Sequence, residues 1–274
     1  MTRTEPTHGF RLRVKALCTL AVLLSAAAPS CDIKEDRGPC PCLLTLIYKD
    51  VPEEAHNVFR ARIYRGEHLL SDEDVDTVAE PDEHSVNVSK GENLVCYFGG
   101  IRKDRLEGDR LLIMEGEESD PLFIGSESVI CRTERTSVLL DFRKEYCLMT
   151  LELEGLSDGV YPYDLEITGN SAGVDIRTLA PVEGRFRCVP STADVKARSA
   201  RIPRQTDTAL TLTLKDRASG MVHSLPLGEL IVEAGYDWNK KNLDDITVRV
   251  DFASDAISIK TSDWETGAVK DVIL

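Results

Sequence analysis

The sequence predicts an all-β protein built of two antiparallel β-sandwich domains in tandem, with one short connecting helix. Three observations support this fold class. Short segments of alternating apolar and polar residues recur along the chain, and a period of two is typical of half-buried strands. The breaks between these segments are rich in Gly, Pro and charged residues, which favour turns. Only one segment has the pattern of a helix.

The first set of strands is expected within residues 42–142. Cys42–Lys49 begins almost entirely apolar, which is typical of a strand covered on both faces. Val58–Tyr64 alternates, so Phe59 and Ile63 are expected on one face of a sheet. An acidic loop is expected at residues 71–83, and short apolar runs follow at residues 85–89, 94–98, 110–114 and 128–132.

The second set is expected within residues 143–274, because the strands outnumber those of one small sandwich. Its candidates are Cys147–Leu156, Tyr163–Gly169, residues 184–190, Leu210–Asp216, Ile246–Phe252 and Ile257–Lys260. The helix is expected within residues 225–238, where Pro226 suits a helix start and Gly235 a helix end. Because it is short, we expect it to connect strands rather than to form a core element.

The first 30 residues have the features of a signal peptide. Arg11, Arg13 and Lys15 precede an uncharged, mostly apolar run at residues 16–28. That run is shorter than the roughly 20 apolar residues needed to span a bilayer. The sequence therefore predicts export and removal of residues 1–30, and no other stretch is long and apolar enough to be a transmembrane helix.

Small residues lead directly to Cys31, the arrangement at which bacterial lipoproteins are lipidated on sulfur and then cleaved. Ala28 stands where such sites usually have Leu. We expect lipid on Cys31 and a polar tether at residues 31–41, so that this lipid is the only membrane attachment. The alternative is simple cleavage that leaves Cys31 free.

Cysteine use agrees with an exported protein. Cys18 would leave with the signal peptide. The six cysteines that remain besides Cys31 are candidate disulfide cysteines or buried thiols: Cys40, Cys42, Cys96, Cys131, Cys147 and Cys188. A zinc site at Cys40-Pro41-Cys42 is disfavoured, because the spacing is too short and no His stands nearby. No metal site is expected.

No motif predicts catalysis or a cofactor. His56, His68, His84 and His223 are scattered, and none of them lies in an HExxH motif or is partnered by a GxSxG nucleophile elbow; GxGxxG and P-loop patterns are absent from the sequence. We expect no catalytic residues and no enzyme activity. The net charge of −14 also disfavours nucleic acid as a partner, because phosphates would be repelled.

Two weaker binding hypotheses concern residues near the C-terminus. Oxygen ligands at Asp237, Asn242, Asp244 and Asp245 would suit calcium, but such residues at turns usually bond their own backbone. Trp238 and Trp264 would suit stacking on a sugar ring, but they more often close the end of a sandwich. We favour the structural interpretation of both sets.

Four segments together carry a family resemblance. They are CDIKEDRGPCP (residues 31–41), RQTDTALTLTL (Arg204–Leu214), GYDWNKKNLDDITVRVDF (Gly235–Phe252) and Asp263-Trp264-Glu265. With these segments the chain resembles the FimB-type fimbrial anchor lipoproteins of Bacteroidales, which sit at the base of type V pili. The resemblance covers the layout of the mature chain and is densest at residues 204–265.

The resemblance implies two tandem transthyretin-like β-sandwiches without enzyme activity. It implies a diacylglycerol-modified, palmitoylated Cys31, with Lys34, Glu35 and Asp36 as a signal for export to the outer face of the outer membrane. The implied function is a structural anchor or minor subunit at the base of a fimbria, which ends polymerisation and controls length. The implied partners are other fimbrial subunits, bound by β-strand exchange.

In such pili a subunit loses its first strand to a protease, and a strand of its neighbour fills the gap. A cut after Arg37 or Lys49 would separate this protein from its lipid. We therefore expect the strand at Cys42–Lys49 to be kept and its groove to stay closed. The apolar tail Ala268–Leu274 is either a strand donated to the next subunit or the last strand of its own sandwich.

Two other functions compete with the anchor. The first is a surface glycan-binding or adhesive lipoprotein, which a cleft of exposed aromatic side chains would favour. The second, more distant, is a secreted hydrolase, which would need converging carboxylates or a Cys/His pair.

Overall fold

The computed structural model describes residues 40–49, 51–55, 57–154, 162–192, 197–251 and 256–273. Residues Cys40–Leu274 form one compact unit. The predicted signal peptide, the lipidation site Cys31 and the export signal Lys34, Glu35 and Asp36 lie outside the described residues. None of the described helices is long and apolar enough to cross a membrane.

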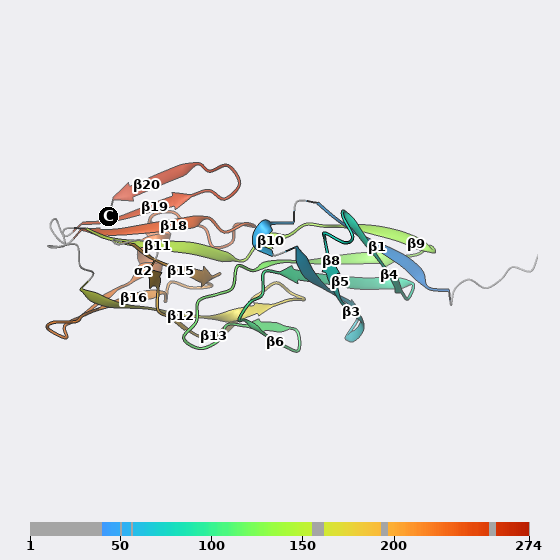
Figure 1. The fold of residues 1–274 in the computed structure, drawn as a ribbon, viewed down its shortest axis with the longest axis horizontal. Coiled ribbons are helices and arrows are strands. Elements are labelled where there is room, and N and C mark those ends of the chain that lie inside the picture. Colours follow the sequence, from blue (N-terminus) through green and yellow to red (C-terminus); the bar gives the residue numbers. More distant parts are fainter. Residues whose placement is uncertain are drawn as a thin grey trace, which may run out of the picture. The chain divides into compact units, whose positions relative to one another are not determined.

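The described elements are almost all strands, which confirms the all-β class (Figure 1). The first are β1 (Cys42–Tyr48), η1 (Glu53–Ala55), β2 (Val58–Arg65), β3 (His68–Asp76), β4 (Glu83–Val88), β5 (Gly91–Gly99), β6 (Arg105–Glu107), β7 (Arg110–Leu112), β8 (Phe123–Cys131), β9 (Arg135–Leu140) and β10 (Arg143–Lys144). Then follow β11 (Tyr146–Glu154), β12 (Tyr163–Asp175), β13 (Pro181–Cys188), β14 (Ser191–Thr192), β15 (Ala197–Pro203), β16 (Thr211–Asp216), β17 (Val222–Leu225), α2 (Leu227–Glu233), β18 (Asp245–Asp251), β19 (Ala256–Ser262) and β20 (Val269–Ile273).

Two sheets form the N-terminal sandwich. One has the order β4-β1-β9 and the other the order β10-β8-β5-β2-β3. Strand β1 lies in the middle of the smaller sheet, antiparallel to β4 and parallel to β9. Its alternate residues Cys42, Leu44, Leu46 and Tyr48 are buried in the core between the sheets.

Two larger sheets form the C-terminal sandwich. Their orders are β14-β15-β11-β18-β19-β20 and β17-β16-β12-β7-β6, with β13 paired to β12. Strand β11 is antiparallel to β15 and parallel to β18. The core is lined by side chains of both sheets, among them Leu151, Ile167 and Phe186.

The two sandwiches share one strand plan. In each, the first strand lies between an antiparallel and a parallel partner: β1 between β4 and β9, and β11 between β15 and β18. In each, the second strand belongs to the opposite sheet, where it lies between the third strand and a later one: β2 between β3 and β5, and β12 between β13 and β16. Within the described residues, β9 ends its sheet, whereas its counterpart β18 continues into β19 and β20. The hairpin β19–β20 is thus an addition to the shared plan.

A second addition is the hairpin β6–β7, which precedes the C-terminal sandwich in sequence. Strand β7 pairs with β12, with Leu111 opposite Val174. Residues 105–112 therefore complete a sheet whose other strands all follow residue 145. The division of the chain into residues 42–142 and 143–274 stays a prediction.

The outer face of β1 differs from the expectation of a strand covered on both faces. Leu43, Thr45 and Ile47 are half-buried. The sheet β4-β1-β9 is covered by the opposite sheet on one face, which is the face toward the core. The apolar side chains of the other face are shielded only by their neighbours in the sheet, such as Ser85 opposite Thr45.

The expectation of an acidic loop at residues 71–83 is wrong for residues 71–76, which belong to β3. Strand β3 pairs with β2, and Arg62 lies opposite Asp72. Arg62 Nη2 is 2.9 Å from Asp72 Oδ2, and Arg60 Nη2 is 2.8 Å from the same oxygen. Because the arginines neutralise this carboxylate, the acidic run forms an edge strand, where charge also discourages edge-to-edge aggregation.

The predicted short helix is confirmed as α2. Pro226 precedes its first residue, and Gly235 follows it with φ of 81°. This left-handed conformation favours glycine, and the N–H of Gly235 donates to the carbonyl of Val232 at 2.9 Å. Leu227 and Ile231 face the core of the C-terminal sandwich. The helix connects β17 to β18, as expected, but it also contributes to the core, contrary to the expectation of a connector alone.

Candidate functional site at the first strand and the C-terminal hairpin

The first strand, β1, is held in its sandwich along its whole length. Its register with β4 runs from Cys42 opposite Val88 to Ile47 opposite Glu83. On its other side it pairs with β9 from Leu43 to Tyr48. The groove that β1 fills is therefore occupied by the protein's own chain on both edges.

Tyr48 fixes the end of β1 that is farther from the tether. Its hydroxyl donates to the carbonyl of Glu80, and its ring packs edge-on against Phe59 with centroids 5.0 Å apart. Its backbone N–H donates to the carbonyl of Asp82 at 3.0 Å. Burial, followed by the negative charge of Glu80, raises the pKa of Tyr48, so the phenol stays neutral and keeps donating.

His84 links the strands that flank this end of β1. It lies on β4, opposite Leu46, and contacts two carboxylates: Nδ1 is 2.5 Å from Glu80 and Nε2 is 2.9 Å from Glu73. Burial alone would lower the pKa of His84, but the hydrogen bonds to Glu80 and Glu73 outweigh it and raise the pKa. The ring joins β4 to Glu73 on β3, and the raised pKa favours its protonated form.

The C-terminal hairpin, formed by β19 and β20, extends the sheet beyond β18. Strand β20 is the last in the sheet order, so its outer edge has no partner strand among the described residues. Val269 and Ile273 are exposed, the latter by 80%, while Val272 packs against the core. A free edge with apolar side chains is a template on which another strand can add.

The turn of this hairpin is organised by Asp263. Its Oδ1 accepts hydrogen bonds from the N–H groups of Glu265 and Thr266 and from the Thr266 hydroxyl, at 2.7 to 3.0 Å. Its Oδ2 accepts a hydrogen bond from Lys240, which also bonds Asp244 at 2.7 Å. The Lys240 ammonium, followed by the Thr266 donors, lowers the pKa of Asp263.

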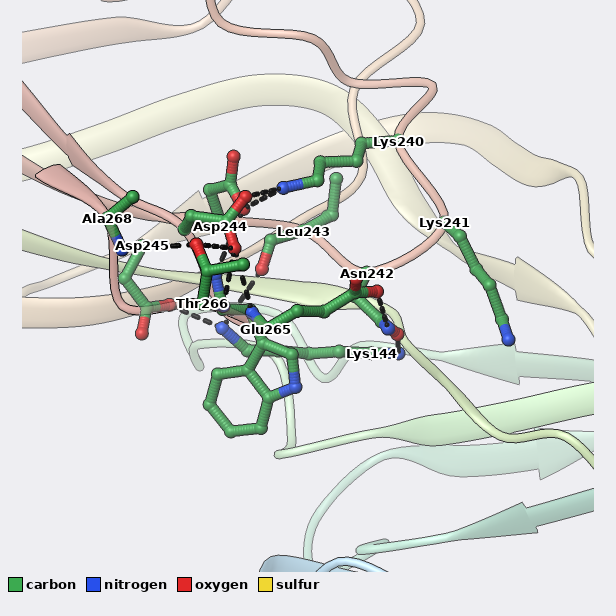
Figure 2. Close-up of polar contacts among 12 residues, drawn as sticks. Lys144, Lys240, Lys241, Asn242, Leu243, Asp244, Asp245, Glu265, Thr266 and Ala268 are labelled. Carbon is green, nitrogen blue, oxygen red and sulfur yellow. Dashed lines mark hydrogen bonds and ion pairs between the residues drawn. The ribbon is translucent and has the colours of Figure 1, made fainter. Parts of the chain in front are cut away.

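Lys144 lies beside the same turn (Figure 2), and its side chain is fully buried. Its Nζ is 2.5 Å from Asp245 Oδ1 and donates to the carbonyl of Leu243 at 3.1 Å. The same ammonium lies 4.2 Å from the centroid of the Trp264 ring and 4.8 Å from that of Tyr146. A desolvated ammonium over an indole ring is strongly attracted to it. We call these contacts, with the Lys240–Asp263 pair, the turn latch.

Asn242 adds two further bonds to the turn latch. Its Oδ1 accepts from the N–H of Lys144 at 2.8 Å, and its Nδ2 donates to Glu265 at 2.9 Å (Figure 2). The structure therefore brings residues 240–245 and 263–265, from two of the segments that carry the resemblance, next to each other. The carboxylates considered for calcium instead contact lysines or backbone N–H groups, and no group of three His, Cys, Asp or Glu in the described part of the chain is arranged to hold a metal ion.

The two tryptophans do not share a cleft. Trp238 is 6% exposed and packs edge-on against Tyr236, with centroids 4.7 Å apart. Trp264 is 37% exposed, but one face of its ring lies against the Lys144 ammonium and the ring is near Phe123, with centroids 6.2 Å apart. Both therefore have structural contacts at the positions where a sugar platform was considered.

The six candidate disulfide cysteines are free thiols in the structure. Cys40 is exposed, whereas Cys42, Cys96, Cys131, Cys147 and Cys188 are buried. The interpretation as buried thiols describes these five, and the pairing of any two stays a prediction.

Sequence reasoning missed Lys144 altogether. It stands at the start of KEYCL, where one lysine beside one glutamate carries no period and no motif. The only available signal was its place between two strand patterns. Its partners Asp245 and Trp264 are about 100 or more residues away in sequence, so only the tertiary fold brings them together.

No family model matches this sequence, and no curated protein matches it either. Solved structures do. A candidate polysaccharide-binding protein from Bacteroides thetaiotaomicron matches with a TM-score of 0.63 and 14% identity, over 84% of this chain and 98% of its own. The fimbrial anchor protein Mfa2 from Porphyromonas gingivalis matches with a TM-score of 0.59 and 11% identity, over 84% and 99%.

A candidate adhesin from Bacteroides thetaiotaomicron also matches, with a TM-score of 0.58 and 15% identity, over 82% of this chain and 97% of its own. At such identities the likeness is one of fold. The described chain thus has the tandem β-sandwich fold found in Mfa2, and the predicted resemblance to fimbrial anchors is confirmed at the level of fold. The matches span both sandwiches, because nearly the whole of each matched chain is covered.

Proposed function

We propose that the protein is a lipid-anchored structural subunit at the base of a surface fimbria, without enzyme activity. In this proposal lipid on Cys31 holds it in the outer membrane, and Lys34, Glu35 and Asp36 direct it to the outer face. Its body meets the next fimbrial subunit through strand pairing, which ends the fibre at this point. The likeness to Mfa2 supports the proposal, since that protein is a fimbrial anchor.

The occupied groove of the N-terminal sandwich is the observation that carries the proposal. Strand β1 has partners on both edges and four buried side chains facing the core. Burial of each of the larger apolar side chains contributes about 1.5–3 kcal/mol, so the strand is costly to remove. A subunit with a filled groove accepts no strand at that end, which suits the first subunit of a fibre.

The outer edge of β20 then becomes the surface that meets the next subunit. Its backbone groups are available for pairing, and Val269 and Ile273 offer apolar contacts on the same strand. Because the turn latch fixes residues 263–266 to Lys144 and Lys240, we propose that the hairpin stays in place and that the partner strand adds to it. Two roles were considered for Ala268–Leu274, a strand donated to the next subunit and the last strand of its own sandwich. In this proposal the tail has the second role, and its outer edge is the surface to which the next subunit binds.

Two variants test this docking edge in cells that lack the native protein. Deletion of Ala268–Leu274 removes β20, and we expect fimbriae to leave the cells while the truncated protein stays folded and membrane-bound. Lys260→Cys combined with Asp271→Cys, which lie opposite each other, would lock β20 to β19 by a disulfide. Addition to the outer edge predicts normal attachment by the locked protein, whereas a detached donor strand predicts release. Normal attachment after deletion would refute the docking edge altogether.

An adhesive or glycan-binding surface lipoprotein is the second candidate function. It is favoured by the likeness to a candidate polysaccharide-binding protein and by a hollow of about 470 Å³ beside Trp238, whose lining includes Gln205, Asp207 and Asn239. Trp238 itself is buried against Tyr236, so it offers no open stacking face. Specific binding on a glycan array that is lost in Asp207→Ala, with fimbriae unaffected by loss of the protein, would support this function over the anchor.

A further inference from the structure

Two buried cysteines meet at the end of β1 that adjoins the tether. Cys42 is the first residue of β1, and Cys131 is the last residue of β8. These strands belong to the two opposite sheets of the N-terminal sandwich (Figure 1). Both side chains are part of its hydrophobic core, and neither is more than 1% exposed.

The two thiols share one hydroxyl partner. Cys42 Sγ donates to Thr136 Oγ1 on β9 at 3.5 Å, and the Cys131 thiol contacts both that hydroxyl and the Cys42 thiol. The other buried cysteines have different surroundings: Cys96 lies against Ser126 at 3.7 Å, and Cys147 contacts Tyr236. Among the five buried thiols in the described part of the chain, Cys42 and Cys131 are thus the pair that lies in mutual contact.

We propose that Cys42 and Cys131 form a disulfide in the exported protein, which fastens the first strand covalently to the opposite sheet. The oxidant is a disulfide-bearing thiol oxidoreductase. One cysteine thiolate attacks the oxidant's disulfide and expels one of its sulfurs, which gives a mixed disulfide. The other thiolate then attacks the protein sulfur of that mixed disulfide and expels the oxidant's second sulfur. The Sγ–Sγ bond forms, and the oxidant is reduced to two thiols that take up the two protons.

The burial of the pair sets when this happens. Burial, followed by the neighbouring Cys42 thiol, raises the pKa of Cys131, so the folded thiol is a poor nucleophile. Oxidation therefore takes place while the sandwich forms, before β1 closes over Cys131. Afterwards the bond is shielded from reductants in solution by the same core.

This bond changes what a cut near the tether would do. Lys49 is exposed at the end of β1, so a protease has access to it. With the disulfide in place, a cut after Lys49 leaves β1, and the lipid that the proposed function places on Cys31, joined to the body through Cys42. A cut after Arg37 would still release the body. The disulfide thus protects the attachment against a cut after Lys49, but not against a cut within the tether.

Peptide mapping of the full chain, purified from membranes and alkylated under denaturing conditions without reduction, tests the pairing. Trypsin yields residues 38–49, which contain Cys40 and Cys42, and residues 111–132, which contain Cys131. We expect the two peptides to be linked, to separate after reduction, and to stay linked in Cys40→Ser. The link should be lost in Cys42→Ser and Cys131→Ser, whose folding is checked by circular dichroism.

Alkylated Cys42 and Cys131 in unreduced wild type, a link between Cys131 and any other cysteine, or loss of the link in Cys40→Ser would overturn the inference. Cleavage by a lysine-specific protease gives a second readout. The segment 35–49, which contains Cys42, should stay with the body on a non-reducing denaturing gel and leave it after reduction. Both readouts are independent of fimbriae, so failure of the anchor function would leave the pairing intact, and the reverse also holds.

Discussion

The ammonium of Lys144, which ends the last strand of the N-terminal sandwich, lies 4.2 Å from the ring of Trp264, in the turn of the C-terminal hairpin. The same ammonium is paired with Asp245 at the start of β18. One buried cation therefore connects residues from both sandwiches with the hairpin that we propose as the docking edge. The stability of the hairpin should depend on it.

Lys144→Met should destabilise the protein, because it keeps the side-chain volume but leaves Asp245 without its cation and Trp264 without its ammonium. We expect a loss of about 2 kcal/mol in the free energy of unfolding, below the usual range for buried pairs because Asp245 is 31% exposed. Urea unfolding measures it. Lys103→Met is a matched control: its pair with Glu117 is exposed, so a much smaller loss is expected. Equal losses in the two variants would contradict the role of the turn latch.

Asp263→Ala should loosen the hairpin locally. It removes the acceptor of two turn N–H groups and the partner of Lys240, so the amides of Val269–Ile273 should exchange hydrogen faster. Hydrogen exchange read by mass spectrometry resolves the segment. Asp216→Ala is the control, since Asp216 caps the turn before β17 in the same way, with N–H donors at 2.7 Å. It should speed exchange around β16 and β17 and leave β20 unchanged.

His84 predicts a pH dependence of the N-terminal sandwich. Its pKa is raised in the folded state by Glu80 and Glu73, which outweigh the effect of burial. A raised pKa means that the folded state binds the proton more tightly, so the stabilisation is complete below the unfolded pKa of about 6.5 and is lost as the pH rises through the folded pKa. Unfolding midpoints should fall from pH 6 toward pH 9. In His84→Gln that fall should be smaller. An unchanged dependence of the unfolding midpoint on pH would show that His84 does not cause it.

Asp104 predicts a gain of stability on neutralisation. Burial, followed by the charge of Asp120, raises the pKa of Asp104 to about 7, and its Oδ1 is buried without a hydrogen-bond partner in the described structure. The folded state therefore favours the protonated form, and stability falls as the pH rises from about 4 through 7. Asp104→Asn should stabilise the protein by about 2–4 kcal/mol at pH 8 and by little at pH 4. Asp74→Asn, at an exposed site on β3, should change neither value by more than about 0.5 kcal/mol.

Local patterns predicted most strands well, because the period of two depends only on which face is buried. Val58–Tyr64 became β2, and Cys147–Leu156 became β11 with ends shifted by one or two residues. Direction and partner were not predictable in the same way. The parallel pairing of β1 with β9 joins segments about 90 residues apart, and alternation is identical in parallel and antiparallel strands.

For the C-terminal hairpin, the sequence predicted one of the two strands but neither their pairing nor their contact with Lys144. Ile257–Lys260 was expected as a strand, and β19 contains it, but the pairing of β20 with β19 follows from the turn that Asp263 and Gly267 make. The resemblance drew attention to Asp263-Trp264-Glu265 without saying what they contact. Lys144, which supplies the contact, carries no sequence signal. The lipidation and export residues remain predictions of the sequence.

The anchor function is tested most directly by Cys31→Ala in cells that otherwise lack the protein. The measurement is the fraction of fimbrial protein recovered from the medium rather than from the cells, with Cys18→Ala as the control that should behave as wild type. We predict that Cys31→Ala moves most fimbriae into the medium and that they carry the variant protein with them. Fimbriae that stay on the cells although the variant is made and folded would contradict the anchor.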